Sequence, residues 1–226
     1  AEAAAGAGLV VEAVPEDLEL KTRVLAEAEA LVDDDAVLAT NTSSLPVTEI
    51  AAALERPGRA VGLHFFNPAY VMALVEVVLA EQTTGETRAW AEAFVEGIDR
   101  TPVTVRDAPG FATSRLGVAL GVEAMRMVQA GVASPRDIDA AMELGYRHPQ
   151  GPLALTDLVG LDVRLDILCH LREELGERFA PPPILRRKVR AGHLGKKTGR
   201  GFYVWEDGEP VAVAGEDGDR DRGLEG

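Results

Sequence analysis

A histidine and a glutamate stand twelve positions apart in the stretch GLHFFNPAYVMALVEVVLA. His64 closes one apolar run and Glu76 lies inside the next, with the turn-forming residues Asn67 and Pro68 between them. If the two runs pair as a hairpin centred near Tyr70, positions whose numbers sum to 140 face each other, so His64 faces Glu76. A carboxylate beside an imidazole fixes its tautomer and raises its proton affinity, which suits a general base. A core histidine held by an acid for structural reasons is the open alternative.

Polar side chains follow a second apolar run, AVLAT, as the tetrapeptide NTSS at 41–44. Ligands of an open parallel sheet bind beyond the carboxyl ends of its strands, so the sequence predicts that this cluster of an amide and three hydroxyls lies at a ligand site. The alternative is that Ser43 or Ser44 caps the helix expected to begin near Pro46. Capping would account for one of these residues and not for all four.

The segment EAVPEDLELK has the same placement after the first apolar run, and it offers Glu16 and Lys21. An ordinary helix start with an acidic first turn is the alternative for both. Lysine is scarce, with 4 lysines beside 19 arginines, so a lysine marks a place that needs a compact ammonium, unless codon bias explains the ratio. Two of the four lie in GKKTGRGFY, whose glycines let the backbone approach a ligand such as a phosphate.

The first half of the chain alternates apolar runs with helical patterns, which predicts a parallel α/β sheet with crossover helices. Strands are expected at 8–14, 36–40, 60–66, 74–80 and 101–107, with helical patterns between several of them. Beyond Pro109 only helices are expected, at 110–131, 134–145, 161–176 and 184–192. Ser134 is the expected N-cap of the second of these and Gly145 its stop.

Composition limits the classes of function. The chain has 226 residues and is 46% hydrophobic, so a sizeable core is expected. It contains no apolar run long enough to span a membrane. The net charge of −14 repels polyanions, which argues against nucleic-acid binding. A single cysteine, Cys169, cannot form an internal disulfide, and the cytoplasm is the simplest compartment. The scattered histidines show no metal-ligand spacing.

Six motifs together carry a resemblance to a known family. VVEAVPEDLELK, ATNTSSLPVTEIA, GLHFFNPAYVMALVEVV, DAPGFATSRL, GPLALTDLVGLD and GKKTGRGFY occur here in the order and spacing of the L-3-hydroxyacyl-CoA dehydrogenases. The resemblance runs from about residue 8 to 205. It implies an NAD-dependent oxidoreductase that interconverts (S)-3-hydroxyacyl-CoA and 3-oxoacyl-CoA in fatty-acid metabolism and works as a homodimer.

The resemblance also implies a domain organisation. An α/β part, 1–107, corresponds to a Rossmann-like NAD-binding domain, and 108–205 correspond to an all-helical dimerisation domain. The glycine-rich loop of the family would precede residue 1, so we expect the distal part of the NAD-binding domain. Residues 206–226 are acidic, with too little apolar content to fold.

Residue roles follow from the same resemblance. His64 matches the catalytic base and Glu76 the acid that orients it. Ser43 matches a hydroxyl that contacts both substrate and cofactor. Ser114 stands where many members have asparagine; its hydroxyl can still donate one hydrogen bond to the thioester carbonyl, with a shorter reach.

The cofactor contacts implied by the resemblance are Glu16, Lys21, Asn41, Ser43 and Lys197. Two alternatives remain from the sequence. One is a related dehydrogenase of free 3-hydroxy acids, because most coenzyme A contacts of the family lie outside this chain. The other is a non-catalytic dimerisation fragment of a truncated enzyme.

Overall fold

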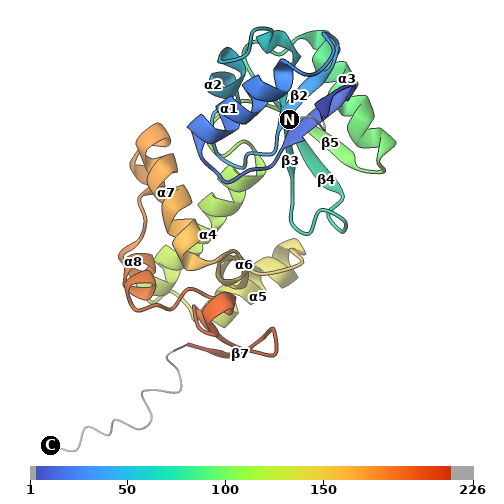
Figure 1. The fold of residues 1–226 in the computed structure, drawn as a ribbon. Coiled ribbons are helices and arrows are strands. Elements are labelled where there is room, and N and C mark those ends of the chain that lie inside the picture. The colour runs from blue at the N-terminus through green and yellow to red at the C-terminus, as the bar shows by residue number, and fades with distance from the viewer. Residues whose placement is uncertain (1–3, 215–226) are drawn as a thin grey trace, which may run out of the picture. The chain divides into compact units, whose positions relative to one another are not determined.

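A computed structural model of the protein describes residues 4–214. The chain forms two compact units, Ala1–Ala112 and Thr113–Gly226, called here the first and the second unit. Figure 1 shows strands and helices together in the first unit and mostly helices in the second. Each unit is described by itself.

The first unit is built on a five-stranded sheet in the order β1-β2-β3-β4-β5. Its strands are β1 (Leu9–Glu12), β2 (Val37–Thr40), β3 (Ala60–Phe65), β4 (Leu74–Leu79) and β5 (Thr101–Arg106). β1, β2 and β3 are parallel, β4 is antiparallel to β3, and β5 is parallel to β4. The predicted strands, and the hairpin register that pairs His64 with Glu76, are confirmed.

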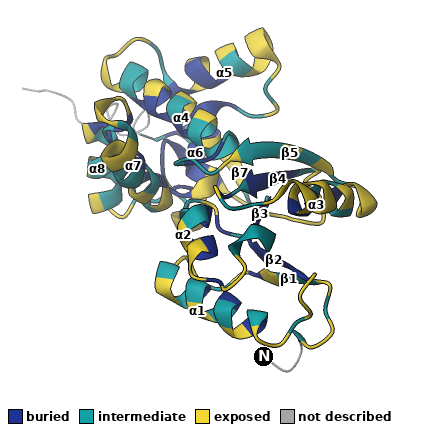
Figure 2. Cartoon of the chain, turned by 90° about the horizontal axis from the view of Figure 1, so that it is seen from above, coloured by how far each residue is buried: buried dark blue, intermediate teal, exposed yellow. Residues whose placement is uncertain are grey.

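Helices cover both faces of this sheet. Successive strand residues point to opposite faces, and the strands place apolar side chains on both of them. Its helices are α1 (Leu18–Glu29), α2 (Val47–Ala52), the 3-10 turn η2 (Pro57–Arg59) and α3 (Gly85–Gly97). Leu38 packs with α1 and α2, whereas its neighbours in β2 pack with α3. Figure 2 shows α1 and α2 on one side of the sheet and α3 on the other.

The second unit packs helices around its own core. Its elements are α4 (Thr113–Gln129), α5 (Pro135–Tyr146), α6 (Pro152–Val159), α7 (Leu161–Leu175), the turn η3 (Glu177–Phe179), α8 (Pro183–Arg190), the turn η4 (Lys196–Thr198), β6 (Tyr203–Glu206) and β7 (Glu209–Val213). Val122, Leu153, Leu168 and Phe202 are among its buried core residues. β6 and β7 form a two-stranded antiparallel sheet.

Helix α6 was not predicted from the sequence, and a carboxylate from another helix supports its start. Asp139 of α5 accepts hydrogen bonds from the backbone N–H groups of Leu153 (2.8 Å) and Ala154 (2.9 Å) in the first turn of α6. These donors have no partner within their own helix, and a negative charge is favourable there. Gly151 makes the approach possible, because a Cβ at that position would lie 2.1 Å from the Cβ of Asp139.

Two boundary predictions in the second unit are wrong. Ser134 is the N-cap of α5 as predicted, but Gly145 does not end the helix, which continues to Tyr146 and ends with Arg147 in the left-handed region at φ 59°. Residues 206–226 were expected not to fold, yet those up to 214 include β7, in which Val213 is buried. Strand pairing with β6 and the packing of Val213 in the core of the second unit hold this segment. Residues 215–226 lie outside the described residues.

No helix within residues 4–214 is long and apolar enough to cross a membrane.

Candidate active site

His64 and Glu76 form a buried pair across β3 and β4. The Nδ1 atom of His64 lies 2.8 Å from Oε2 of Glu76, and the two residues are directly opposite in the antiparallel register. Their side chains are 8% and 0% exposed, so little water competes for the contact. Both side chains point to the sheet face that carries α1 and α2, because their strand neighbours Leu63 and Val75 pack on the face of α3.

The surroundings restrain both members of the pair. The ring of Phe66 lies 4.4 Å from that of His64 between centroids, and the ring of Phe111 lies 5.8 Å away. Oε1 of Glu76 accepts a hydrogen bond from the backbone N–H of Ala112 at 3.1 Å. A carboxylate that is anchored in this way presents Oε2 to the imidazole in one fixed direction.

The imidazole keeps one nitrogen for other chemistry. An ionised Glu76 accepts the proton on Nδ1 of His64, so Nε2 carries the lone pair. Within the described part of the chain, Nε2 of His64 has no hydrogen-bond partner. The pair can therefore accept one proton at Nε2 and stabilise the resulting imidazolium.

Glu16 holds the loop that follows β2. Its Oε1 accepts hydrogen bonds from the hydroxyl of Thr42 (2.6 Å) and from the backbone N–H groups of Ser43 (3.0 Å) and Ser44 (3.1 Å). Both serine hydroxyls also donate to it, at 3.3 and 3.2 Å. Burial raises the pKa of Glu16, but the hydrogen bonds from Thr42 and Ser43 and the charge of Lys21 outweigh it, so the pKa is lowered.

Two expectations about this region are wrong. Neither Ser43 nor Ser44 caps α2, whose N-cap is Pro46 without a side-chain hydrogen bond. The serines instead donate to Glu16, a partner distant in sequence. Glu16 does not lie in the first turn of α1 either, because Asp17 is the N-cap and the helix begins at Leu18.

Lys21 is the most buried of the predicted site residues after Glu76, at 1% exposed. Its ammonium lies 3.2 Å from both carboxylate oxygens of Glu12 and 3.3 Å from Oε2 of Glu16. It also donates to the carbonyl of Val14 at 3.0 Å. Lys21 thus joins the end of β1 to the carboxylate that holds the serine loop.

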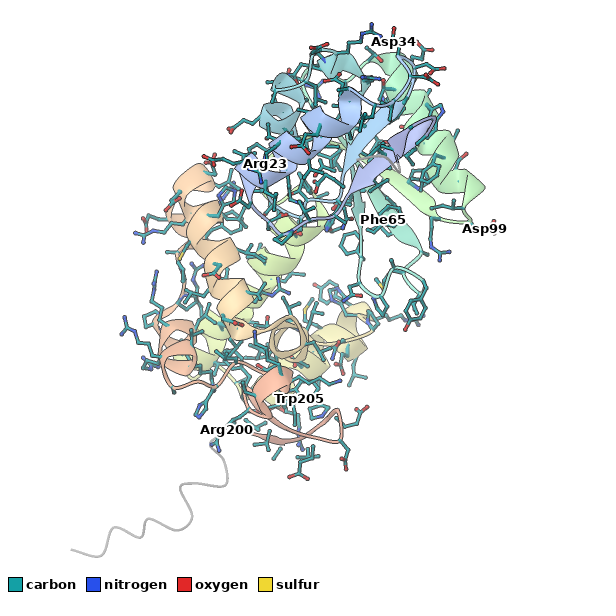
Figure 3. The ribbon with its side chains drawn as sticks, viewed as in Figure 1. Arg23, Asp34, Phe65, Asp99, Arg200 and Trp205 are labelled. Atoms are coloured by element: carbon teal, nitrogen blue, oxygen red, sulfur yellow. The ribbon has the colours of Figure 1, made fainter. Side chains whose placement is uncertain are left out.

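Asn41 connects the ends of β2 and β3. Its side-chain oxygen accepts a hydrogen bond from the backbone N–H of Phe65 at 3.0 Å. The backbone N–H of Asn41 donates to the carbonyl of Glu12 at 2.9 Å. Figure 3 labels Phe65, the last residue of β3 and the neighbour of His64. Asn41 therefore ties together the strand ends that carry Glu12 and His64.

Ser114 and Lys197 belong to the second unit. Ser114 is half-buried in the first turn of α4. Lys197, on η4, is exposed, and its ammonium lies 2.6 Å from Oδ2 of Asp162 on α7. The structure therefore brings His64 together with Glu76, and Glu16 together with Lys21 and Ser43.

The glycines of GKKTGRGFY have a structural purpose that the sequence did not reveal. They lie against Asp157 of α6: a Cβ at Gly195 would be 2.2 Å from its carbonyl oxygen, and one at Gly201 would be 2.1 Å from Oδ1. The Asp157 carboxylate accepts the N–H groups of Phe202 and Tyr203 and the indole N–H of Trp205, each at 2.9 Å. The phosphate-cradle interpretation is therefore replaced by close packing around a buried carboxylate.

Sequence reasoning missed Glu12, Thr42 and Asp157. Glu12 had a visible signal, because it is a charged residue inside the apolar run GLVVEAV. Thr42 is one of four neighbouring polar residues, with nothing to single it out. Asp157 lies in a helix that was not predicted, and its partners follow more than forty positions later.

The strand ends offer groups that fit a dinucleotide. β1, β2 and β3 are parallel and in register, so Glu16, Ser43 and His64 all belong to their carboxyl ends, the edge where such sheets bind ligands. Glu16 and Ser43 are exposed there, and a carboxylate and a hydroxyl suit ribose hydroxyls as partners. No group of three His, Cys, Asp or Glu side chains among residues 4–214 could hold a metal ion.

Both units match models of one protein family. Residues 1–108 match the NAD binding domain of the 3-hydroxyacyl-CoA dehydrogenases, and residues 110–205 match their C-terminal domain. The chain belongs to the 3-hydroxyacyl-CoA dehydrogenase family. This dehydrogenase is an NAD-dependent oxidoreductase of 3-hydroxyacyl-CoA, with a Rossmann-like α/β NAD-binding domain followed by a helical domain.

Similar proteins from other organisms support this assignment. The dehydrogenase is 45% identical over 207 residues to a probable 3-hydroxybutyryl-CoA dehydrogenase of Bacillus subtilis, covering 91% of this chain and 72% of that protein. It is 46% identical over 200 residues to a 3-hydroxybutyryl-CoA dehydrogenase of Mycobacterium tuberculosis, covering 87% and 70%. The crystal structure of (S)-3-hydroxybutyryl-CoA dehydrogenase from Ralstonia eutropha is similar with a TM-score of 0.85 at 41% identity, covering 88% and 71%.

Proposed function

We propose that this dehydrogenase oxidises the 3-hydroxyl group of a short-chain (S)-3-hydroxyacyl-CoA with His64 as the general base and Glu76 as its orienting acid. Oxidation of a secondary alcohol removes a proton from oxygen and a hydride from carbon. NAD, when bound, supplies the acceptor for the hydride. The protein then needs a base, an acid that orients it and hydrogen bonds to the oxygen.

The contact of 2.8 Å between Nδ1 of His64 and Oε2 of Glu76 carries the proposal. Nε2 of His64 takes the proton of the 3-hydroxyl group as the C–H bond breaks, and the 3-oxo group forms. Glu76 stabilises the imidazolium that results, because it is buried and cannot be screened by water. In the reverse direction the imidazolium returns the proton to the oxygen.

The remaining residues complete the proposal. Ser43 positions the oxygen of the substrate next to the base, and Glu16 and Asn41 shape the cofactor side of the strand ends. Lys21 supports Glu16 from its buried position 3.3 Å away. We add Ser114 as a donor to the thioester carbonyl and Lys197 as a cofactor contact on the ground of family membership.

The names of relatives support the short acyl chain. Proteins 42–46% identical to this one from five bacterial strains are called 3-hydroxybutyryl-CoA dehydrogenases or probable ones. A direct comparison of acetoacetyl-CoA, longer 3-oxoacyl-CoA esters and free 3-oxo acids as substrates for reduction tests this part. A preference for a free acid would favour the related 3-hydroxy-acid dehydrogenase instead.

The decisive experiment replaces the base. We expect His64→Ala to lower kcat by about 100- to 10,000-fold, which is the usual contribution of general base catalysis. Circular dichroism should show an unchanged fold, and His148→Ala, a loop substitution in the second unit, should retain full activity. A verified His64→Ala protein within tenfold of the original kcat would contradict the proposal.

We also propose that two copies pair through the second unit and that the dehydrogenase works in the cytoplasm. Exposed apolar side chains support pairing, among them Leu116 (67% exposed), Leu144 (83%) and Tyr146 (76%). The single free cysteine, Cys169, suits a reducing compartment. Sedimentation as a monomer at all concentrations would contradict the dimer.

A further inference from the structure

Glu12 is a buried charge that the proposed reaction does not use. Its side chain is 1% exposed, at the carboxyl end of β1 and opposite Thr40 in the sheet register. Burial of a carboxylate is costly unless other groups compensate its charge and fill its hydrogen-bonding positions. The surroundings of Glu12 therefore show what this residue is for.

A single ammonium satisfies most of that demand. Lys21 lies 3.2 Å from each oxygen of Glu12, the hydroxyl of Thr40 donates to Oε1, and the backbone N–H of Val14 donates to Oε2 at 3.1 Å. The ammonium of Lys21 also reaches Oε2 of Glu16 at 3.3 Å. Three charges thus follow one another in the order Glu12, Lys21, Glu16, with signs that alternate.

Glu16 divides its two oxygens between different partners. Oε2 faces Lys21, whereas Oε1 accepts the donors of the serine loop, including the backbone N–H groups of Ser43 and Ser44. Within the described residues, Glu12 and Glu16 are the only acids in ion pairs with Lys21. If Glu12 lost its charge, Lys21 would be left with Glu16 as its counter-charge and would draw that carboxylate away from the loop.

We infer that Glu12 is a positioning residue: by neutralising Lys21 it leaves Glu16 free to hold the loop that carries Ser43 in its place. Glu12 touches neither the reacting atoms nor the base, and it acts through Lys21. The inference rests on the proposed function only in so far as the Ser43 loop serves the cofactor and the substrate.

The test uses three variants that keep the side-chain sizes similar. Glu12→Gln removes the negative charge, and Glu12→Gln with Lys21→Met removes both buried charges. Glu27→Gln makes the same chemical change at an exposed position of α1 and is the matched control. A purely structural role for Glu12 predicts that the double variant is more damaged than the single one, whereas positioning through Lys21 predicts that it recovers.

Amide hydrogen exchange, measured without cofactor, reports whether the backbone N–H groups of the Ser43 loop keep their hydrogen bonds. We expect Glu12→Gln to speed exchange at Ser43 and Ser44 about tenfold relative to Leu38 and Ala39 in β2, since these loop amides lose Glu16 as acceptor. The double variant should return to within about twofold of the original rate, as should Glu27→Gln. Unchanged exchange in Glu12→Gln, or faster exchange in the double variant than in the single one, would overturn the inference.

Binding of NADH, followed by its fluorescence, connects the loop to the reaction. We expect Glu12→Gln to raise the dissociation constant about tenfold, with kcat at saturating cofactor changed less than threefold. Fast exchange at Ser43 and Ser44 with an unchanged dissociation constant would overturn the role of Glu12 in the reaction. An original protein that failed to bind NADH would count against the proposed function, and the exchange measurements would still decide whether Glu12 positions the loop.

Discussion

Glu76 in the first unit and Asp157 in the second are both 0% exposed, yet their carboxylates have different kinds of partner. Glu76 meets a titratable partner, the imidazole of His64, at 2.8 Å. Asp157 meets two backbone N–H groups and the indole N–H of Trp205, none of which changes charge near neutral pH. Figure 3 labels Trp205 on the short β6–β7 hairpin that this carboxylate holds.

The difference shows how a buried charge can serve chemistry or architecture. The partners of Asp157 are fixed donors, and Gly195 and Gly201 close against it, so the site is filled on those sides. Glu76 instead shares its charge with a ring whose second nitrogen has no partner in the described residues. A buried acid points to catalysis when its partner can itself gain or lose a proton.

Of the substitutions that test this difference, Glu76→Gln has the largest expected effect, a loss of kcat. Because the N–H of Ala112 requires an acceptor at the Oε1 position, the amide NH₂ would face His64 and donate to Nδ1. Nε2 would then hold the proton and could not accept another, so kcat should fall on the order of 1,000-fold, as when a triad acid becomes its amide. Stopped-flow reduction of acetoacetyl-CoA checks the rate, and a loss below tenfold would make Glu76 a structural residue.

Asp157→Ala tests the architectural side. Three N–H donors would lose their acceptor in a buried site, and each such loss costs about 1–3 kcal/mol, so the free energy of unfolding of the second unit should fall by about 3 kcal/mol or more. Urea unfolding followed by tryptophan fluorescence in a Trp90→Phe background, in which Trp205 is the remaining tryptophan, measures it. Asp166→Ala, an exposed position on α7, is the control. An unchanged free energy of unfolding in Asp157→Ala would show that Asp157 does not have the architectural role that separates it from Glu76.

Acid pH gives the smallest expected effect, at Glu16. Because the pKa of Glu16 is lowered from 4.5 in the folded chain, its contribution to stability is present above about pH 4.5 and is lost as the pH falls through the lowered value. Thr42→Val removes a hydrogen bond of 2.6 Å and should move this loss to higher pH. Urea unfolding between pH 3 and pH 6 checks both points, and an identical pH profile in Glu16→Gln would contradict them.

Much of the first unit could be predicted from the sequence because its signals are local. Apolar runs of five to seven residues marked four of the strands, and the alternating segment TPVTVRD marked the fifth. A hairpin centred near Tyr70 predicted the register that pairs His64 with Glu76. The second unit was harder, because α6 depends on Asp139 of another helix and its own sequence, PLALTDLV, lacks a polar face that would distinguish it from a strand.

The candidate site divides in the same way. His64, Glu76 and Ser43 could be found because their types and positions stand out in apolar surroundings or at strand ends. Glu12 and Asp157 could not be assigned all their partners, because Thr40 lies 28 positions from Glu12 and Phe202 lies 45 positions from Asp157. Contacts of that span arise only when separate elements pack.

The sequence by itself determined the strands, the register that brings an imidazole to a carboxylate and the family to which the chain belongs. These depend on periodicity, turns and motifs, which are properties of neighbouring residues. Only the tertiary structure decided that Lys21 is buried between two acids, that Glu16 holds the serine loop and that two glycines make room for Asp157. Burial and hydrogen bonding between distant residues give these groups their roles, because a charge removed from water depends on whatever the fold places beside it.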